Sequence, residues 1–248
     1  MAATRSEGRH VPDTVRAAAR AGEPDRYLAA LLAPGGLSAD LVALAAFSAE
    51  LHRARDVVRE PLMGEIRLQW WRDALPALAR GERTANPVAD ALGAAMLRHN
   101  LMPAQLEPSI EARSLELQGG HGECAVADAE AALFKAALLV LGVPAAPASD
   151  ALCAAAGVAY GVARVAAAPG IRADRGNIAR AQAALEAALG RVRELDTRAL
   201  PAFLPLVMVE PYLRVLEQRD AGHVEHFAHS LPLRRAWRIW RAHRRGWI

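Results

Sequence analysis

Two acidic residues one helical turn apart are the first side chains whose spacing could support chemistry. They are Asp56 and Glu60, within ELHRARDVVREPLMGEIRLQWWRDAL, residues 50–75. Residues four apart share one face of a helix, so both carboxylates point the same way. Such a pair can hold Mg²⁺, whose other ligands are water and phosphate oxygens. The same spacing also fits a solvated helix face, where Arg53 would form a local ion pair.

The segments that must position this pair are helical in pattern. Of the 248 residues, 53% are hydrophobic and 23% are charged, and alanine dominates the apolar set. Leu41, Leu44 and Leu51 recur at helical spacing, and Asn86 followed by Pro87 forms a helix start. Alternating strand patterns and hairpin turn signals are absent from the sequence. The sequence therefore predicts an all-α fold.

We expect residues 1–22 to form a flexible leader and residues 23–248 to form a single domain. The first residues contain no apolar signal region, and the chain contains no run of about 18 apolar residues. Cys124 and Cys153 lack the spacing of a zinc site or a redox pair, so we expect a reducing, cytoplasmic setting. A formal net charge of +3 does not indicate nucleic acid as a partner.

Three segments carry a family resemblance. DRYLAALLAP, FSAELHRARDVVREP and RLQWWRDAL, in this order, resemble the squalene/phytoene synthase family. The resemblance implies an isoprenoid synthase-like helical bundle around a central cavity. It also implies a prenyl diphosphate or lipid ligand, with Mg²⁺ held by two aspartate-rich motifs on facing helices. It places the first motif on Asp56 and Glu60, and it matches Arg53 to a basic residue just before that motif.

The second motif is altered in this chain. The matching stretch, AYGVARVAAAPGIRADRG, has Arg164 where the family has asparagine, and Ala168 and Arg172 replace its two aspartates. Metal held on both sides is what neutralises a leaving diphosphate, so this loss predicts a pseudoenzyme. Arginines bind phosphate directly, so Arg53, Arg164 and Arg172 are candidate diphosphate contacts. The alternative is an active Mg²⁺-dependent prenyltransferase of the phytoene or squalene synthase type.

The phrase GEIRLQWWRDAL resembles one branch of the family in particular. That branch is a mitochondrial assembly factor for respiratory complex I. The resemblance implies complex I subunits as partners and a peripheral position on the inner membrane. The protein would face the cytoplasm, or the mitochondrial matrix in a eukaryote.

The C-terminal stretch LPLRRAWRIWRAHRRGWI predicts an amphipathic helix with one apolar and one basic face. Leu233, Trp237, Trp240 and Trp247 fall in one sector of such a helix, and most of its arginines fall in the neighbouring sector. This pattern is typical of a helix that lies on anionic lipid. It also fits an acidic protein surface or RNA. A further alternative is that the tryptophans dock on the body of the protein and the arginines face water.

Overall fold

A computed structural model describes residues 11–56, 61–118, 123–167, 174–220, 231–246 and 248, and within these ranges it contains no strand. This confirms the all-α prediction. The elements are α1 (Asp13–Gly22), α2 (Pro24–Ala30), α3 (Leu37–Asp56), α4 (Pro61–Ala79), α5 (Pro87–His99), α6 (Pro103–Leu117), α7 (Glu123–Val140), α8 (Pro147–Ala167), α9 (Arg175–Val192), η1 (Thr197–Ala199), α10 (Leu200–Phe203), η2 (Leu204–Met208), α11 (Val209–Asp220) and α12 (Leu231–Arg245).

Local sequence sets several of these boundaries. Proline, which lacks the N–H that the first turn leaves unpaired, is the first residue of α4, α5, α6 and α8. The Asn86 side chain accepts hydrogen bonds from the backbone N–H groups of Val88 and Ala89, as predicted for the start of α5. Asn100 ends the same helix in the left-handed conformation, with φ of 52°.

Residues 13–22 belong to the folded domain, so the predicted leader is wrong for this segment. They form α1, which packs on α3. Val15 and Ala19, one turn apart, are fully buried. A Cβ on Gly22 would lie 2.6 Å from the Cβ of Ala49, so only glycine permits this approach. Tertiary packing holds a helix that is too short to be stable alone. Residues 1–10 of the predicted leader lie outside the described ranges.

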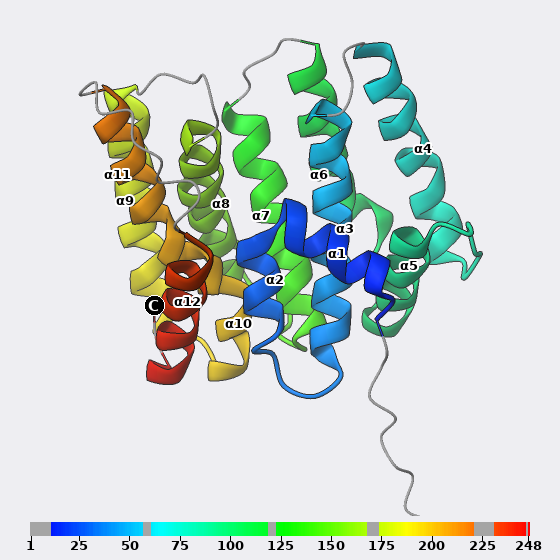
Figure 1. Ribbon diagram of the computed structural model, residues 1–248. Coiled ribbons are helices and arrows are strands. Elements are labelled where there is room, and N and C mark those ends of the chain that lie inside the picture. Colours follow the sequence, from blue (N-terminus) through cyan, green and yellow to red (C-terminus); the bar gives the residue numbers. More distant parts are fainter. Residues whose placement is uncertain (1–10, 57–60, 119–122, 168–173, 221–230, 247) are drawn as a thin grey trace, which may run out of the picture.

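The long helices run up and down in one bundle (Figure 1). Helix α7 packs against both α6 and α8, and α8 packs against α9. The helices α3, α6 and α8 end at the top of Figure 1, and α4, α7 and α9 begin there. The helix ends next to both predicted motifs therefore lie at this same end of the bundle.

The core is built from aromatic contacts between alanine-rich helices. Phe47 packs edge-on against Trp71 with ring centroids 4.9 Å apart, and Phe134 stacks on Phe203 at 5.4 Å. The stretch Thr197–Glu217 is long and apolar enough to cross a membrane, but 67% of its most apolar window is buried inside the protein. Within this structure it therefore packs as part of the core.

Candidate functional site

The ends of two helices carry the predicted motif segments. Helix α3 ends at Asp56 and helix α8 ends at Ala167. Both ends lie at the top of the bundle in Figure 1. The sequence analysis expected facing helices to carry the two motifs, and the fold brings both segments to the same end of the molecule.

The structure describes the side chains of only some of the predicted site residues. Asp56 is the last residue of α3, and its side chain is not among the described ones. Glu60 and Arg172 lie outside the described ranges, so the predicted carboxylate pair and the second arginine have no described geometry. The Arg53 side chain is 56% exposed and forms a local ion pair with Glu50, with 3.1 Å between Nη1 and Oε1.

Arg164 lies inside the bundle between two carboxylates. Its Nη1 is 2.6 Å from Oε1 of Glu23, on the residue that precedes α2, and 3.3 Å from Oε1 of Glu130 on α7. The two carboxylates raise the pKa of its guanidinium well above the usual value, although burial opposes this. This arginine is therefore fixed in its charged form by groups of the protein itself.

Glu23, which binds Arg164, also contacts two side chains of α3. His52 Nε2 lies 3.1 Å from Glu23 Oε1, and the Ser48 hydroxyl donates a hydrogen bond to the same oxygen at 2.7 Å. Burial alone would raise the pKa of Glu23, but the charge of Arg164 and the hydrogen bond from His52 hold this pKa well below its ordinary value. Burial and the nearby charge of Arg164 lower the pKa of His52 to about 4. His52 is therefore neutral at neutral pH.

A second buried pair sits beside the first. The Arg26 guanidinium donates a hydrogen bond to Glu130 and lies 4.6 Å from the ring centroid of Phe134. It also lies 5.2 Å from the centroid of the Tyr160 ring. Aromatic faces attract cations, so these rings help to hold the guanidinium away from water.

Asp25 binds a further set of buried side chains next to these pairs. It accepts hydrogen bonds from the hydroxyl groups of Tyr160 at 2.9 Å and Tyr212 at 2.6 Å. Arg235 of α12 approaches it with Nε 2.7 Å from Oδ1. Burial raises the pKa of Asp25 even though Arg235 and the two hydroxyls favour the charged form. Helices α2, α8, α11 and α12 therefore meet at one carboxyl group.

Charges balance within this buried cluster. We define it by three carboxylates, three guanidinium groups and the neutral side chains that bind them. Each carboxylate faces at least one guanidinium, so the three acidic side chains are neutralised by the protein itself. No set of three metal-ligating side chains was found among the described residues. The side chains of the predicted Mg²⁺ ligands, Asp56 and Glu60, are not among the described ones. The members are Glu23, Asp25, Arg26, Ser48, His52, Glu130, Tyr160, Arg164, Tyr212 and Arg235.

Most of this cluster was not predicted from the sequence. Two signals could have indicated it. Glu23, Asp25 and Arg26 directly precede an apolar helical stretch, and Glu130 lies within the alanine-rich helix α7. Charged residues are seldom fully buried unless they are paired, so these positions required partners.

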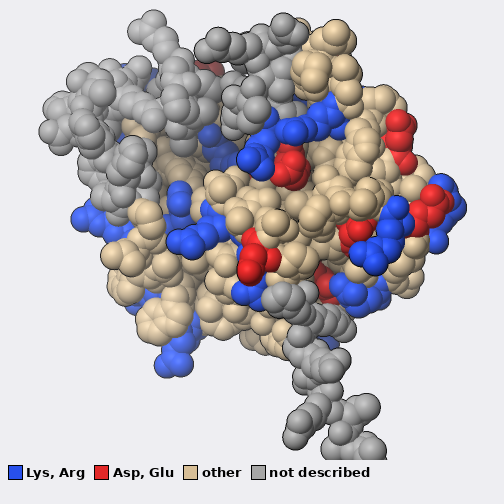
Figure 2. Space-filling model, turned by 45° about the vertical axis from the view of Figure 1, so that its right-hand side comes forward, with Lys and Arg blue, Asp and Glu red and all other residues tan. Residues whose placement is uncertain are grey.

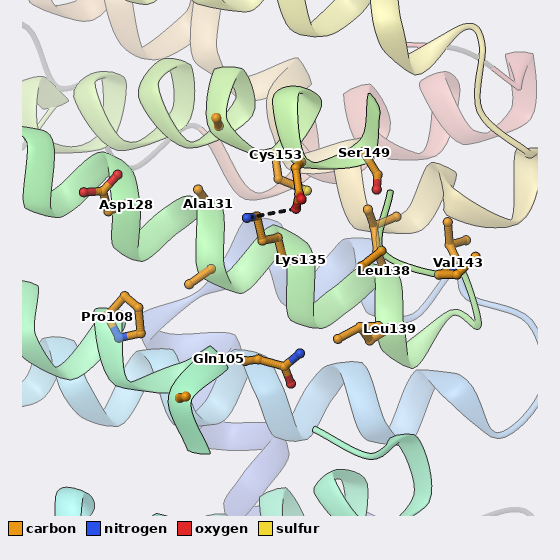
Figure 3. A pocket seen from close by; sticks show the side chains of 16 residues that line it. Gln105, Pro108, Asp128, Ala131, Lys135, Leu138, Leu139, Val143, Ser149 and Cys153 are labelled. Carbon is orange, nitrogen blue, oxygen red and sulfur yellow. Dashed lines mark ion pairs between the residues drawn. The ribbon is translucent and has the colours of Figure 1, made fainter. Parts of the chain in front are cut away.

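A separate groove lies between α6, α7 and α8 (Figure 3). It has a volume of about 470 Å³ and is lined mainly by apolar side chains of α6, α7 and α8. Lys135, the only lysine of the chain, forms an ion pair across it with Asp150, with 2.9 Å between Nζ and Oδ1. Burial raises the pKa of the Cys153 thiol to about 12. The groove therefore offers neither an unpaired cation for a diphosphate nor a reactive thiolate.

Comparison with known proteins agrees with this architecture. The structure is similar to the crystal structure of squalene synthase HpnC from Alicyclobacillus acidocaldarius, with a TM-score of 0.64 at 17% sequence identity. The alignment covers 84% of this chain and 94% of that one. The fold is thus that of an isoprenoid synthase-like helical bundle.

The sequence itself assigns the family. The squalene/phytoene synthase profile matches residues 19–178, more than half of the chain, so this protein belongs to the squalene/phytoene synthase family. This confirms the predicted resemblance.

Curated relatives share part of the sequence. The chain is 36% identical over 93 residues to "NADH dehydrogenase (ubiquinone) complex I, assembly factor 6" of Rattus norvegicus, and 33% identical over 91 residues to that of Homo sapiens. The matched stretch is 38% and 37% of this chain, but only 28% and 27% of those relatives.

Proposed function

We propose that this protein is a non-catalytic member of its family that acts at the surface of the cytoplasmic or inner mitochondrial membrane and assists the assembly of respiratory complex I. One observation carries the non-catalytic part: Arg164, within the stretch that matches the second motif, is bound by Glu23 and Glu130. A guanidinium that already neutralises two buried carboxylates does not offer its charge to a diphosphate. In sequence, Ala168 and Arg172 supply no carboxylate for a metal on this side.

A prenyltransferase assay tests this part. We expect no product when the pure protein is incubated with farnesyl or geranylgeranyl diphosphate and Mg²⁺. An active family member, assayed in parallel, provides the positive control. Product formation that is lost on Asp56→Ala would establish the alternative, an active Mg²⁺-dependent prenyltransferase. The arrangement of α3 and α8, whose ends share one end of the bundle, favours this alternative.

The curated relatives supply the support for a role in complex I assembly. They are named as complex I assembly factors, and the match covers little more than a quarter of their length. We expect tagged protein to co-purify with partly assembled complex I, and we expect deletion of its gene to lower the amount of mature complex. Normal complex I in the deletion strain, without co-purification, would contradict this role.

Helix α12 supports the membrane part of the proposal. Ile239 and Ala242 face the body of the protein and are buried. Leu233, Trp237 and Trp240 point away from it and are 85%, 53% and 50% exposed. Their exposure favours lipid contact over the alternative in which the tryptophans dock on the body; Trp247 lies outside the described residues.

The charges of α12 match an anionic lipid surface. The helix contains six arginines and no acidic residue. Arg241 lies 4.8 Å from the ring centroid of Trp237, and Arg244 lies 5.8 Å from that of Trp240. Basic and aromatic groups are therefore presented together, as in helices that bind at the lipid headgroup level.

Vesicle flotation tests this surface. We expect binding to phosphatidylcholine vesicles only when they contain an anionic lipid, and we expect Trp237→Ser with Trp240→Ser to abolish it. Each exposed arginine contributes about 1 kcal/mol near such a surface, so Arg238→Ser should weaken binding roughly fivefold. Trp70→Ser, which removes a partly exposed tryptophan on α4, is the matched control. Equal binding by all variants would contradict the membrane role.

A further inference from the structure

Helix α12 carries apolar side chains on two opposite sides. Residues two positions apart lie on nearly opposite sides of an α-helix, because one turn takes about 3.6 residues. In α12 an exposed tryptophan is twice followed, two positions later, by a buried apolar residue: Trp237 by Ile239, and Trp240 by Ala242. A helix that lies at the lipid headgroup level buries only one side in the membrane. The two apolar sides of α12 therefore need two different partners.

The body of the protein covers one of these sides. Helix α12 packs on α2 and η2 at the outside of the bundle (Figure 1). Ile239 is 1% exposed in this contact. Arg235, one turn before Ile239 on the same side, has Nε 2.7 Å from Oδ1 of Asp25, and its Nη2 donates a hydrogen bond to the Tyr212 hydroxyl at 3.4 Å. These contacts use the inner side of α12 and leave its tryptophans outside.

We propose that an anionic membrane surface binds α12 while this helix stays docked on the bundle, so that α12 bridges the body and the lipid. Ile239 and Arg235 then act as positioning residues for lipid binding, because they hold the helix from the side that faces the body. This inference rests on the proposed membrane role and adds which state of the protein the lipid recognises.

Docking prepares α12 for the lipid before the membrane is met. A helix of 15 residues is only marginally stable by itself in water, because its first turn is costly to form. Contacts with the body hold it in helical form, which reduces the entropy lost on binding. Release would expose Ile239 to water and take Arg235 away from the buried carboxyl group of Asp25. Both apolar sides of α12 are covered only when it is docked and lipid-bound at the same time.

The basic side chains of α12 lie between its two apolar sides. When the tryptophans face the bilayer, this flank lies at the level of the anionic headgroups. The α4 side of the bundle differs, because Figure 2 shows acidic and basic side chains interspersed there. Charge therefore favours anionic lipid at α12. The exposed arginines of this flank are Arg234, Arg238, Arg241 and Arg245.

A variant that weakens docking distinguishes a docked helix from a released one. A ligand that binds only the docked state binds more weakly as that state becomes less populated, whereas a ligand of the released helix binds more tightly. In flotation with vesicles of phosphatidylcholine and phosphatidylglycerol, we expect Ile239→Ser to weaken binding at least about fivefold. Ile239→Val keeps a buried apolar side chain and should bind within about twofold of the original protein.

A control separates docking from general stability. Gly157→Ala strains the contact between α7 and α8, since its Cβ would lie 2.4 Å from the backbone oxygen of Ala127. This variant leaves α12 and its contacts intact, so it should bind vesicles as the original protein does. Circular dichroism spectra confirm that each variant is folded.

Hydrogen exchange tests the same point in the unmodified protein. The amides of α2 and η2 lie under α12, and their exchange requires local opening. Saturating amounts of the same vesicles should leave this exchange unchanged or slow it, because the helix stays in place.

The outcomes separate this inference from the membrane role itself. Absence of binding by the original protein would overturn both. With binding intact, unchanged or tighter binding by Ile239→Ser, weaker binding by Gly157→Ala, or faster exchange in α2 and η2 on addition of vesicles would each overturn docked binding alone.

Discussion

Arg164 contacts two buried carboxylates, so its removal would take one directly contacting cation from each and leave Arg26 as the nearest guanidinium to both. Breaking a buried ion pair by removing one partner costs about 3–5 kcal/mol. We expect Arg164→Met to lower the free energy of unfolding by about this amount, measured by urea denaturation. Arg53→Met, which removes an exposed arginine with a local partner, should change it by no more than about 0.5 kcal/mol. Similar values for the two variants would show that the cluster contributes little to stability.

His52 makes the stability depend on pH. Its pKa is lowered to about 4 by burial and by the charges of Arg164 and Arg113, whereas an unfolded histidine titrates near 6.5. Between these values the unfolded chain binds a proton that the folded protein does not bind. Its contribution to stability is therefore fully present above about pH 6.5 and is lost as the pH falls towards 4, by at most about 3 kcal/mol.

Urea denaturation at several pH values measures this dependence. His52→Gln keeps a side chain that can donate a hydrogen bond to Glu23 but removes the titration. We expect the free energy of unfolding to fall less steeply between pH 6.5 and 4 in this variant. The difference in slope should correspond to the uptake of at most one proton on unfolding. A variant with the same slope as the original protein would place the proton uptake on other groups.

At the scale of elements, a glycine of α8 tests how closely α7 and α8 approach, and a glycine of α9 serves as the comparison. A Cβ on Gly157 of α8 would lie 2.4 Å from the backbone oxygen of Ala127 on α7. A Cβ on Gly190 of α9 would meet nothing within 4 Å. We expect Gly157→Ala to destabilise the protein by about 1–3 kcal/mol because the helices must separate. Gly190→Ala should stabilise it by roughly 0.5–1 kcal/mol through helix propensity.

Thermal unfolding of the two alanine variants measures this difference. Opposite shifts of the midpoint are the expected result. A midpoint for Gly157→Ala equal to that of the original protein would show that α7 and α8 do not pack as closely as described.

At the scale of the whole molecule, α12 closes the buried cluster. Arg235 reaches Asp25, and Ile239 is buried against the body. A chain that ends at Leu231 loses this cation and uncovers apolar surface. We expect a clearly lower midpoint of thermal unfolding than that of the full chain. Arg238→Ala, an exposed change on the same helix, should have almost no effect. If the shortened chain unfolded at the same temperature, α12 would be an appendage rather than part of the fold.

This coupling bears on how lipid binding should be measured. A shortened chain changes both stability and the membrane surface, whereas Trp237→Ser and Trp240→Ser change exposed side chains only. Point variants therefore separate the two roles of α12.

Helix positions and the family were predictable from local patterns. Asn86 and Pro87 marked the start of α5 because capping depends on a few adjacent residues. The spacing of Leu233, Trp237 and Trp240 predicted that these side chains share one face of α12, but it left open whether that face docks on the body or points outward. Residues 13–22 were misassigned because their burial depends on contact with α3.

The sequence by itself determined the helices, the alteration of the second motif and the amphipathic C-terminal segment, because periodicity and residue type are local properties. Only the tertiary structure decided what Arg164 does, because its partners Glu23 and Glu130 are 141 and 34 residues away along the chain. It likewise brought Asp25 together with Tyr160, Tyr212 and Arg235. A charge's effect depends on distance and burial, and neither is fixed until distant segments pack together.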